Sequence, residues 1–164
     1  AHGRDSRRVT PERSEKSMGH EHTFGSDVRD EAVLNRQLLD QAGQVAVRLR
    51  RGGVLARTVS LKLRFADFTT ITRSKTLAEP TDVARRIHEE VLGLLVAERI
   101  AGRAVRLIGT RAEQLVDAAG ESLSLWSDDD EWRSAERTVD RVASKFGSGT
   151  VRPASLVRKA PPAD

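Results

Sequence analysis

The segment from residue 58 to 65 constrains the fold most, because polar and apolar side chains alternate along it without interruption. Its polar positions carry Thr58, Ser60, Lys62 and Arg64. The positions between them carry Val59, Leu61, Leu63 and Phe65. A strand with this pattern buries one face and leaves the other in water. The chain therefore needs a sheet with one covered face and one open face of hydroxyls and cations.

The remaining elements follow from periodicity and turn residues. Apolar residues at helical spacing predict helices over about 29–51 and 82–97, and an amphipathic helix over 131–146 with Trp132, Val139, Val142 and Phe146 on one side. Strands are predicted over 16–24, 55–65, 68–76 and 104–110. The order β-α-β-β-α-β indicates an α+β fold, in which a four-stranded sheet carries two helices on one face.

The third predicted strand leaves one ambiguity. Phe65 and Phe68 have the parity of core residues, but Phe68 and Ile71 have opposite parity. Either a bulge intervenes, or Ile71 faces outward and Arg73 and Lys75 lie on the open face. We place Arg73 and Lys75 on the open face. In the fourth strand, Val105 and Leu107 are expected to alternate with Arg106.

Charge is distributed unevenly along the chain of 164 residues. Residues 1–111 hold 21 Lys and Arg against 14 Asp and Glu, whereas residues 112–132 hold seven acids and no base. A basic body beside an acidic segment favours a polyanionic partner for the body. The chain has no Cys and no long apolar run, and it does not begin with Met. We expect a monomeric, cytoplasmic piece of a longer bacterial protein, with no disulfide and no membrane partner.

Several sequence blocks, in this order, resemble one known family. They are Lys-Ser-Met-Gly-His-Glu-His-Thr-Phe at 16–24, Asp-Phe-Thr-Thr-Ile-Thr-Arg-Ser-Lys-Thr-Leu at 67–77, Val-Arg-Leu-Ile-Gly at 105–109, and Phe-Gly at 146–147 followed by Arg-Pro-Ala-Ser-Leu at 152–156. Together they are similar to the little finger, the DNA-binding domain of Y-family translesion DNA polymerases of the DNA polymerase IV (DinB) type. The resemblance implies a tether at 1–15, a little finger at 16–111, an acidic linker at 112–130, and a C-terminal helix and tail at 131–164.

The resemblance also implies that the open face lies on duplex DNA and contacts phosphates, with little reading of sequence. The implied DNA-binding residues are Lys16, Ser17, Gly19, Thr23, Thr58, Ser60, Lys62, Arg64, Arg73, Ser74 and Lys75. The alternative is a protein–protein interaction module of the same split β-α-β shape, whose basic face has no nucleic-acid role.

A short apolar island interrupts the acidic segment. Its residues are Ser122, Leu123, Ser124, Leu125 and Trp126. It is similar to the sliding-clamp motif of bacterial polymerases, in which Gln stands at the position of Ser122. The resemblance implies that this island binds the beta subunit of the clamp through its apolar side chains. The alternative is that Trp126 and Trp132 fold back onto the domain.

No catalytic or metal-binding constellation stands out in the sequence. His20 and His22 share a strand face, but we find no third ligand for them and interpret them as structural. The acids at 128–131 are interpreted as a solvated helix start. The resemblance places the catalytic carboxylates and their Mg²⁺ in a palm domain of the longer enzyme. The chain itself is therefore expected to be non-catalytic and to hold no cofactor.

Overall fold

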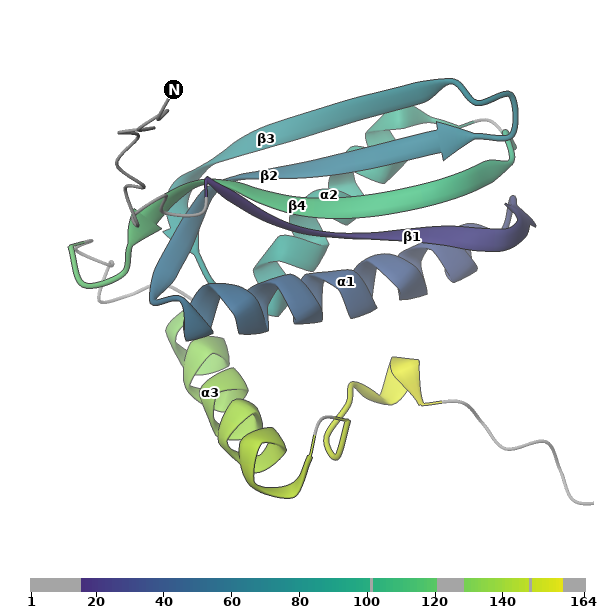
Figure 1. The fold of residues 1–164 in the computed structure, drawn as a ribbon. Helices are drawn as coiled ribbons and strands as arrows, with labels where there is room; N and C mark the ends of the chain where they lie inside the picture. The colour runs from purple at the N-terminus through teal and green to yellow at the C-terminus, as the bar shows by residue number, and fades with distance from the viewer. Residues whose placement is uncertain (1–15, 101, 121–128, 148, 158–164) are drawn as a thin grey trace, which may run out of the picture.

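The computed structural model describes residues 16–100, 102–120, 129–147 and 149–157 (Figure 1). Along the chain, the elements are strand β1 (Ser17–Val28), helix α1 (Glu31–Arg51), strands β2 (Val54–Phe65) and β3 (Thr70–Thr81), helix α2 (Ala84–Glu98), strand β4 (Val105–Asp117), helix α3 (Asp129–Phe146) and the short 3-10 helix η1 (Ala154–Leu156). Within these residues, no helix has both the length and the apolar character needed to cross a lipid bilayer.

The four strands form one antiparallel sheet in the order β1-β4-β2-β3. β2 and β3 pair as a hairpin, while β4 inserts between β1 and β2. α1 and α2 lie side by side on one face of this sheet, and among the described residues no helix covers the other face (Figure 1). The predicted α+β class and the β-α-β-β-α-β order are confirmed.

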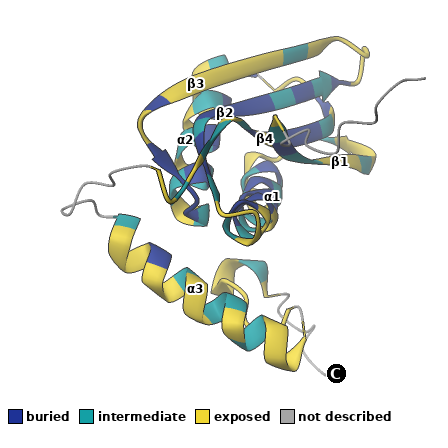
Figure 2. Ribbon diagram, turned by 60° about the vertical axis from the view of Figure 1, so that its left-hand side comes forward, coloured by how far each residue is buried: buried dark blue, intermediate teal, exposed yellow. Residues whose placement is uncertain are grey.

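The core lies between the sheet and the two helices (Figure 2). Apolar residues at helical spacing in α1 are fully buried, among them Leu34, Leu38, Val45 and Leu49. The sheet contributes Val59, Leu61, Leu63 and Phe65, which the alternating pattern assigned to the covered face. The register of β2 is therefore as predicted, because a slip of one residue would expose this whole set.

The ends of several elements differ from the prediction. β1 continues through the Gly-Ser-Asp triplet at 25–27 to Val28, so Asp30 caps α1 by accepting from the backbone N–H of Ala32. β3 runs on to Thr81, and β4 runs on to Asp117, which brings the first residues of the predicted acidic linker into the sheet. Gly52 and Gly53 end the first helix as predicted, and Gly53 has a φ of 63°.

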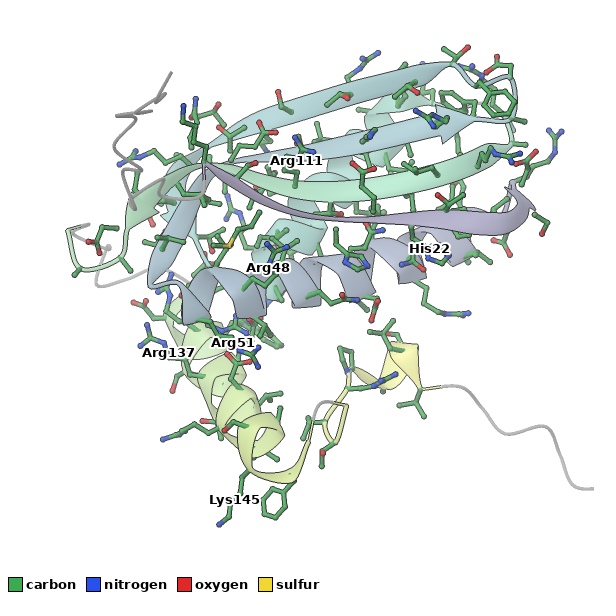
Figure 3. All side chains as sticks on the ribbon, viewed as in Figure 1. His22, Arg48, Arg51, Arg111, Arg137 and Lys145 are labelled. Atoms are coloured by element: carbon green, nitrogen blue, oxygen red, sulfur yellow. The ribbon has the colours of Figure 1, made fainter. Side chains whose placement is uncertain are left out.

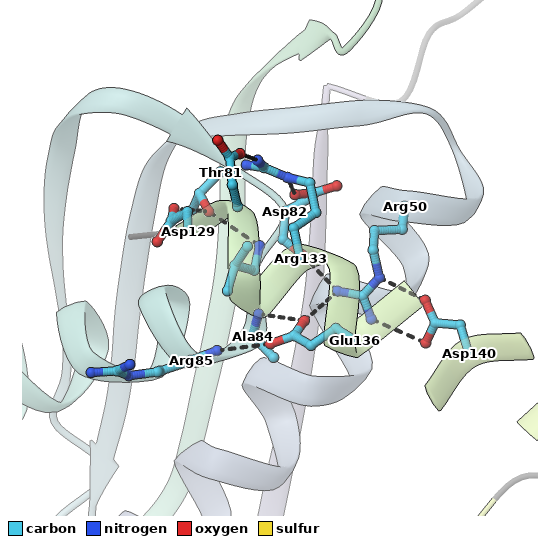
Figure 4. A network of polar contacts seen from close by, with 11 residues as sticks. Arg50, Thr81, Asp82, Ala84, Arg85, Asp129, Arg133, Glu136 and Asp140 are labelled. Atoms are coloured by element: carbon cyan, nitrogen blue, oxygen red, sulfur yellow. Dashed lines mark hydrogen bonds and ion pairs between the residues drawn. The ribbon is translucent and has the colours of Figure 1, made fainter. Parts of the chain in front are cut away.

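α3 is attached to the domain by charged side chains (Figure 4). Arg133 Nε lies 2.7 Å from Asp82 Oδ1, and both side chains are almost fully buried. Arg50, also nearly buried, donates its Nε to Asp140 at 2.6 Å and its Nη1 to Glu136. The predicted apolar side of this helix is not its docking face, since Trp132 and Phe146 remain 45% and 66% exposed.

Glu136 also completes the N-terminus of α2. The residue before that helix is Val83, which has no capping side chain. Instead, the Glu136 carboxylate accepts from the backbone N–H groups of Ala84 at 2.9 Å and Arg85 at 3.3 Å. Burial raises the pKa of Glu136 above its usual value, although these donors and Arg50 oppose the shift. α3 thus supplies a cap that the sequence around α2 lacks.

Candidate nucleic-acid interface

The open face of the sheet is built from rows of side chains that cross all four strands. Pairing of the strands aligns the polar positions of β2 with those of its two neighbours. β3 contributes Thr70, Thr72, Ser74 and Thr76 to this face. β4 contributes Leu107, Gly109, Arg111 and Glu113. β1, at the edge, contributes Ser17, Gly19, Glu21 and Thr23.

Among the described residues, Lys62, Arg64 and Arg111 are the cations that strand pairing places on this open face. Lys62 and Arg64 stand on β2, and Arg111 stands on the neighbouring β4 opposite Ser60. The side chain of Arg111 is 52% exposed and that of Lys62 is 33% exposed. Arg64 is half-buried and donates its Nε to the hydroxyl of Thr70 at 3.0 Å. Guanidinium and ammonium groups flanked by hydroxyls are the donor set that phosphate oxygens accept.

Two carboxylates on the same face hold some of these donors. Glu21 reaches over Gly109 and places both carboxylate oxygens 3.0 Å from Lys62 Nζ. A side chain at Gly109 would block this path, because its Cβ would lie 2.8 Å from the Cγ of Glu21. Glu113 accepts from the Ser60 hydroxyl at 3.2 Å. The face is therefore of mixed charge, with its cations partly neutralised from within.

Arg73 and Lys75 were wrongly assigned to this face. Leu63 pairs with Ile71 and Leu61 with Arg73, so these β3 residues share the helix side of the sheet. β3 is an edge strand of the sheet, and its two cations reach α2. Arg73 lies 2.8 Å from Glu98, and Lys75 pairs with Glu90 of the same helix. The assignment was wrong because it extended the alternation of β3 back through Phe68, and the turn before β3 interrupts that alternation.

Phe68 lies in that turn, outside the strand, so its parity says nothing about β3. It has a φ of 64° and is 64% exposed, which contradicts the predicted core position. The guanidinium of Arg106 stacks 5.0 Å above its ring. Phe65, in contrast, is buried as predicted.

The other predicted contact residues divide by accessibility. Thr58 and Ser60 are on the open face but only 6% and 4% exposed, and Thr58 donates to Gln114 at 2.9 Å. Their hydroxyls already bond to protein neighbours. Lys16 is exposed immediately before β1. Ser17, Gly19, Thr23 and Ser74 lie on the open face, as assigned.

Arg111 was missed because the predicted strand ended at residue 110 and because β4 contains an irregularity. Phe65 pairs with Val105 but Arg64 pairs with Leu107, so one residue is extra on β4 at Arg106. Val105 is consequently buried, whereas Leu107 faces the open side, contrary to the predicted alternation. Beyond the bulge, parity places Arg111 with Lys62 and Arg64. The basic residue at 111 was visible in the sequence, but the bulge was not.

The apolar island at 122–126 lies outside the described residues. In the described part of the chain, no group of three or more His, Asp or Glu side chains is placed to hold a metal ion. Asp129 instead accepts from Thr81 at 2.8 Å, and Asp130 pairs with Arg133 at 2.6 Å. His22 packs edge-on against Phe24, with 4.9 Å between the ring centroids.

Comparison with known proteins identifies relatives along most of the chain. DNA polymerase IV of Desulfatibacillum aliphaticivorans is 36% identical over 162 residues, and that of Caulobacter vibrioides is 37% identical over 152 residues. These matches cover 96% and 92% of this chain, respectively. The chain spans 41% and 38% of the two relatives, which is well under half of their lengths.

Solved structures show the same fold at lower identity. The little finger domain of DNA polymerase IV, in a complex with a beta-clamp processivity factor, superposes with a TM-score of 0.52 at 22% identity. That match covers 68% of this chain and 99% of that domain. A Y-family DNA polymerase chimera gives the same TM-score at 20% identity, covering 63% of this chain and 30% of its own.

The family model described as the impB/mucB/samB family C-terminal domain matches residues 15–125. This range contains all four strands and both helices of the sheet layer, and it ends before α3. The chain therefore belongs to the impB/mucB/samB family, and this range is its C-terminal domain, a little finger of the DNA polymerase IV type.

Proposed function

We propose that this chain is the non-catalytic DNA-binding part of a translesion DNA polymerase and holds the template-primer duplex by its phosphates. The observation that carries the proposal is the open face, where Lys62, Arg64 and Arg111 stand beside rows of hydroxyls. A duplex presents phosphates of both strands to such a face, and each neutralised phosphate releases bound counterions.

The open face favours backbone contact over base stacking. Single-strand binding platforms expose aromatic side chains on which bases stack. Here Phe65 is buried, Phe24 packs against the core, and Phe68 lies in the β2–β3 turn. Affinity from this face should therefore depend steeply on salt and hardly on sequence. The alternative protein–protein module would lack both properties.

Two double substitutions of equal charge change test the proposal. Arg64→Ala/Arg111→Ala removes two cations from the open face, whereas Arg73→Ala/Lys75→Ala removes two from the helix side. Fluorescence anisotropy with a labelled duplex should give a several-fold weaker affinity for the first variant and a flatter salt dependence. The second variant should bind nearly as the unchanged chain does. Equal losses for both variants would exclude the open face as the binding surface.

Clamp recruitment is the second part of the proposed function. The island from Ser122 to Trp126 offers two leucines and a tryptophan between acidic residues, as an apolar plug for a pocket. We expect Leu125→Ala/Trp126→Ala to abolish binding of a labelled sliding clamp while leaving duplex affinity unchanged. Equal clamp affinities for the two chains would assign binding to another segment. The nucleotidyl transfer of the longer enzyme, with its Mg²⁺, is placed outside this chain.

A further inference from the structure

A cleft lies between the C-terminal end of α1 and α3. Its walls, α1 and α3, are on the helix side of the molecule, away from the open face of the sheet (Figure 1). Five of the eight residues that line the cleft are arginines, and the other three are Asp130, Ser134 and Asp140. The arginines are Arg50 and Arg51 from α1, and Arg133, Arg137 and Arg141 from α3.

The arginines of this cleft fall into two groups. Arg50 and Arg133 are nearly buried and fully engaged in the ion pairs that dock α3. Arg51, Arg137 and Arg141 are exposed, and among the described residues none of the three has an acidic partner. Arg141 donates only to the neutral hydroxyl of Thr138 at 3.0 Å. Three guanidinium groups from two helices thus line one cleft without an acidic partner among the described residues.

The ion pairs that dock α3 engage Arg50 and Arg133 but not the other three arginines. Arg51 is in the last turn of α1, where a cation is favourable beside the unpaired carbonyls. Arg137 and Arg141, however, are four residues apart on one face of α3, a like-charge spacing that destabilises a helix. They share the cleft with Arg50 and Arg51 at the end of α1 and with Asp130 and Asp140, whose carboxylates pair with Arg133 and Arg50. An anion in the cleft would relieve this repulsion.

We propose that this arginine cleft binds a second stretch of nucleic-acid backbone, separate from the duplex proposed for the open face. Guanidinium groups bind phosphate oxygens through paired N–H donors, and they are less strongly hydrated than ammonium groups. No aromatic residue is among those that line the cleft, so contacts are made to phosphates and not to stacked bases. The binding is therefore indifferent to sequence.

The position of the cleft makes this a separate site. The helix layer stands between it and the open face, so one straight segment cannot occupy both (Figure 1). The site also depends on α3, because the docked helix brings Arg137 beside Arg51 (Figure 3) and adds Arg141 to the lining of the same cleft.

The test uses two charge reversals of equal size in the full chain. Arg137→Glu reverses a charge in the cleft, and Arg36→Glu reverses one on an exposed residue of α1 with no ion pair among the described residues. Arg36 lies about 22 Å along that helix from Arg51. Both are made in the background Arg64→Ala/Arg111→Ala, so that the open face contributes little. The probe is a short single-stranded DNA oligonucleotide of mixed sequence, titrated at several salt concentrations.

We expect Arg137→Glu to lower the affinity for the oligonucleotide several-fold and to reduce the salt slope by about 0.7, the value for one phosphate on a single strand. Arg36→Glu should leave the slope unchanged. In the ¹⁵N-labelled background chain, the amides of Arg51, Arg137 and Arg141 should shift on titration. Equal losses from both reversals would overturn the proposal in favour of a net-charge effect. It would also be overturned if polyglutamate shifted these amides and the oligonucleotide did not.

Discussion

The carboxylate of Glu21 lies across Gly109 from Lys62, with both of its oxygens 3.0 Å from the ammonium nitrogen. Three strands take part in this contact, because Glu21 is on β1, Gly109 on β4 and Lys62 on β2. Both charged side chains are about one third exposed, so the pair adds little to stability. Its effect is on the charge that the open face presents to a ligand, since Glu21 pairs with a lysine that could otherwise bind a phosphate.

Removal of this carboxylate should strengthen DNA binding. We expect Glu21→Gln to raise the affinity for a duplex several-fold at low salt, because Lys62 is freed and a repulsive charge is lost. Duplex titrations across salt concentrations measure the effect. Glu89→Gln is the matched control, since Glu89 pairs with Arg85 on the helix side of the domain. The same gain in both variants would mean that only net charge matters.

Loss of the Glu136 carboxylate should loosen both α3 and the start of α2. Glu136→Ala leaves the N–H groups of Ala84 and Arg85 without their acceptor, a loss comparable to that of an N-cap, about 0.5–2 kcal/mol. Hydrogen exchange at these two amides should accelerate accordingly.

Glu136→Gln separates the cap from the charge. Burial raises the pKa of Glu136, which indicates that the charged form is costly here, and a neutral amide avoids that cost while keeping an acceptor oxygen. We therefore expect a smaller acceleration of exchange in Glu136→Gln than in Glu136→Ala. Identical exchange in the unchanged chain and in Glu136→Ala would contradict the capping role.

The two faces of the sheet should respond differently to truncation of leucine. Leu63 is fully buried, and Leu63→Ala should cost about 2–5 kcal/mol of unfolding free energy through lost burial and a cavity. Leu107→Ala makes the same chemical change on a half-buried residue of the open face and should cost clearly less. Urea unfolding measures both, and a larger cost at Leu107 would invert the assignment of the faces.

Stability should fall in mildly acidic solution because of His88. Burial lowers the pKa of His88, although Glu89 and Asn35 act in the opposite direction. The folded state therefore prefers the neutral ring, and this contribution is present above the ordinary pKa of 6.5 and is lost as the pH falls through the lowered one. We expect His88→Gln to show a flatter pH dependence of the unfolding free energy below that value. An unchanged slope would assign the dependence to another group.

Periodic patterns in the sequence predicted the layers of this fold correctly. The helical stripe through Leu38 and Leu49 and the alternation through Leu61 and Leu63 each have one dominant cause, the burial of apolar surface. Such patterns do not show where a turn or a bulge interrupts the alternation of a strand. Phe68 belongs to a turn, and the extra residue at Arg106 shifts β4, so the parities of Arg73 and Arg111 could not be read from neighbouring residues.

The docking of α3 illustrates a second limit of prediction. Its sequence pattern predicted an apolar side that includes Trp132 and Phe146. The helix instead contacts the domain through Arg133, Glu136 and Asp140. Charge pairs between distant segments have no period, so the sequence contains the partners without indicating that they meet. The same holds for the arginine cleft, whose two halves are more than eighty residues apart along the chain.

The central place of β4 bears on how the domain assembles during synthesis. β4 is the last strand of the sheet to be made, yet it forms the ladder that joins β1 to the β2–β3 hairpin. Until β4 has left the ribosome, β1 lacks the strand with which it pairs, and β2 is paired with β3 alone. Pairings between such distant segments close late and slowly, since a long loop must be ordered first. The domain should therefore fold as one unit near the end of its synthesis, when β4 pairs with β1 and β2 and completes the sheet.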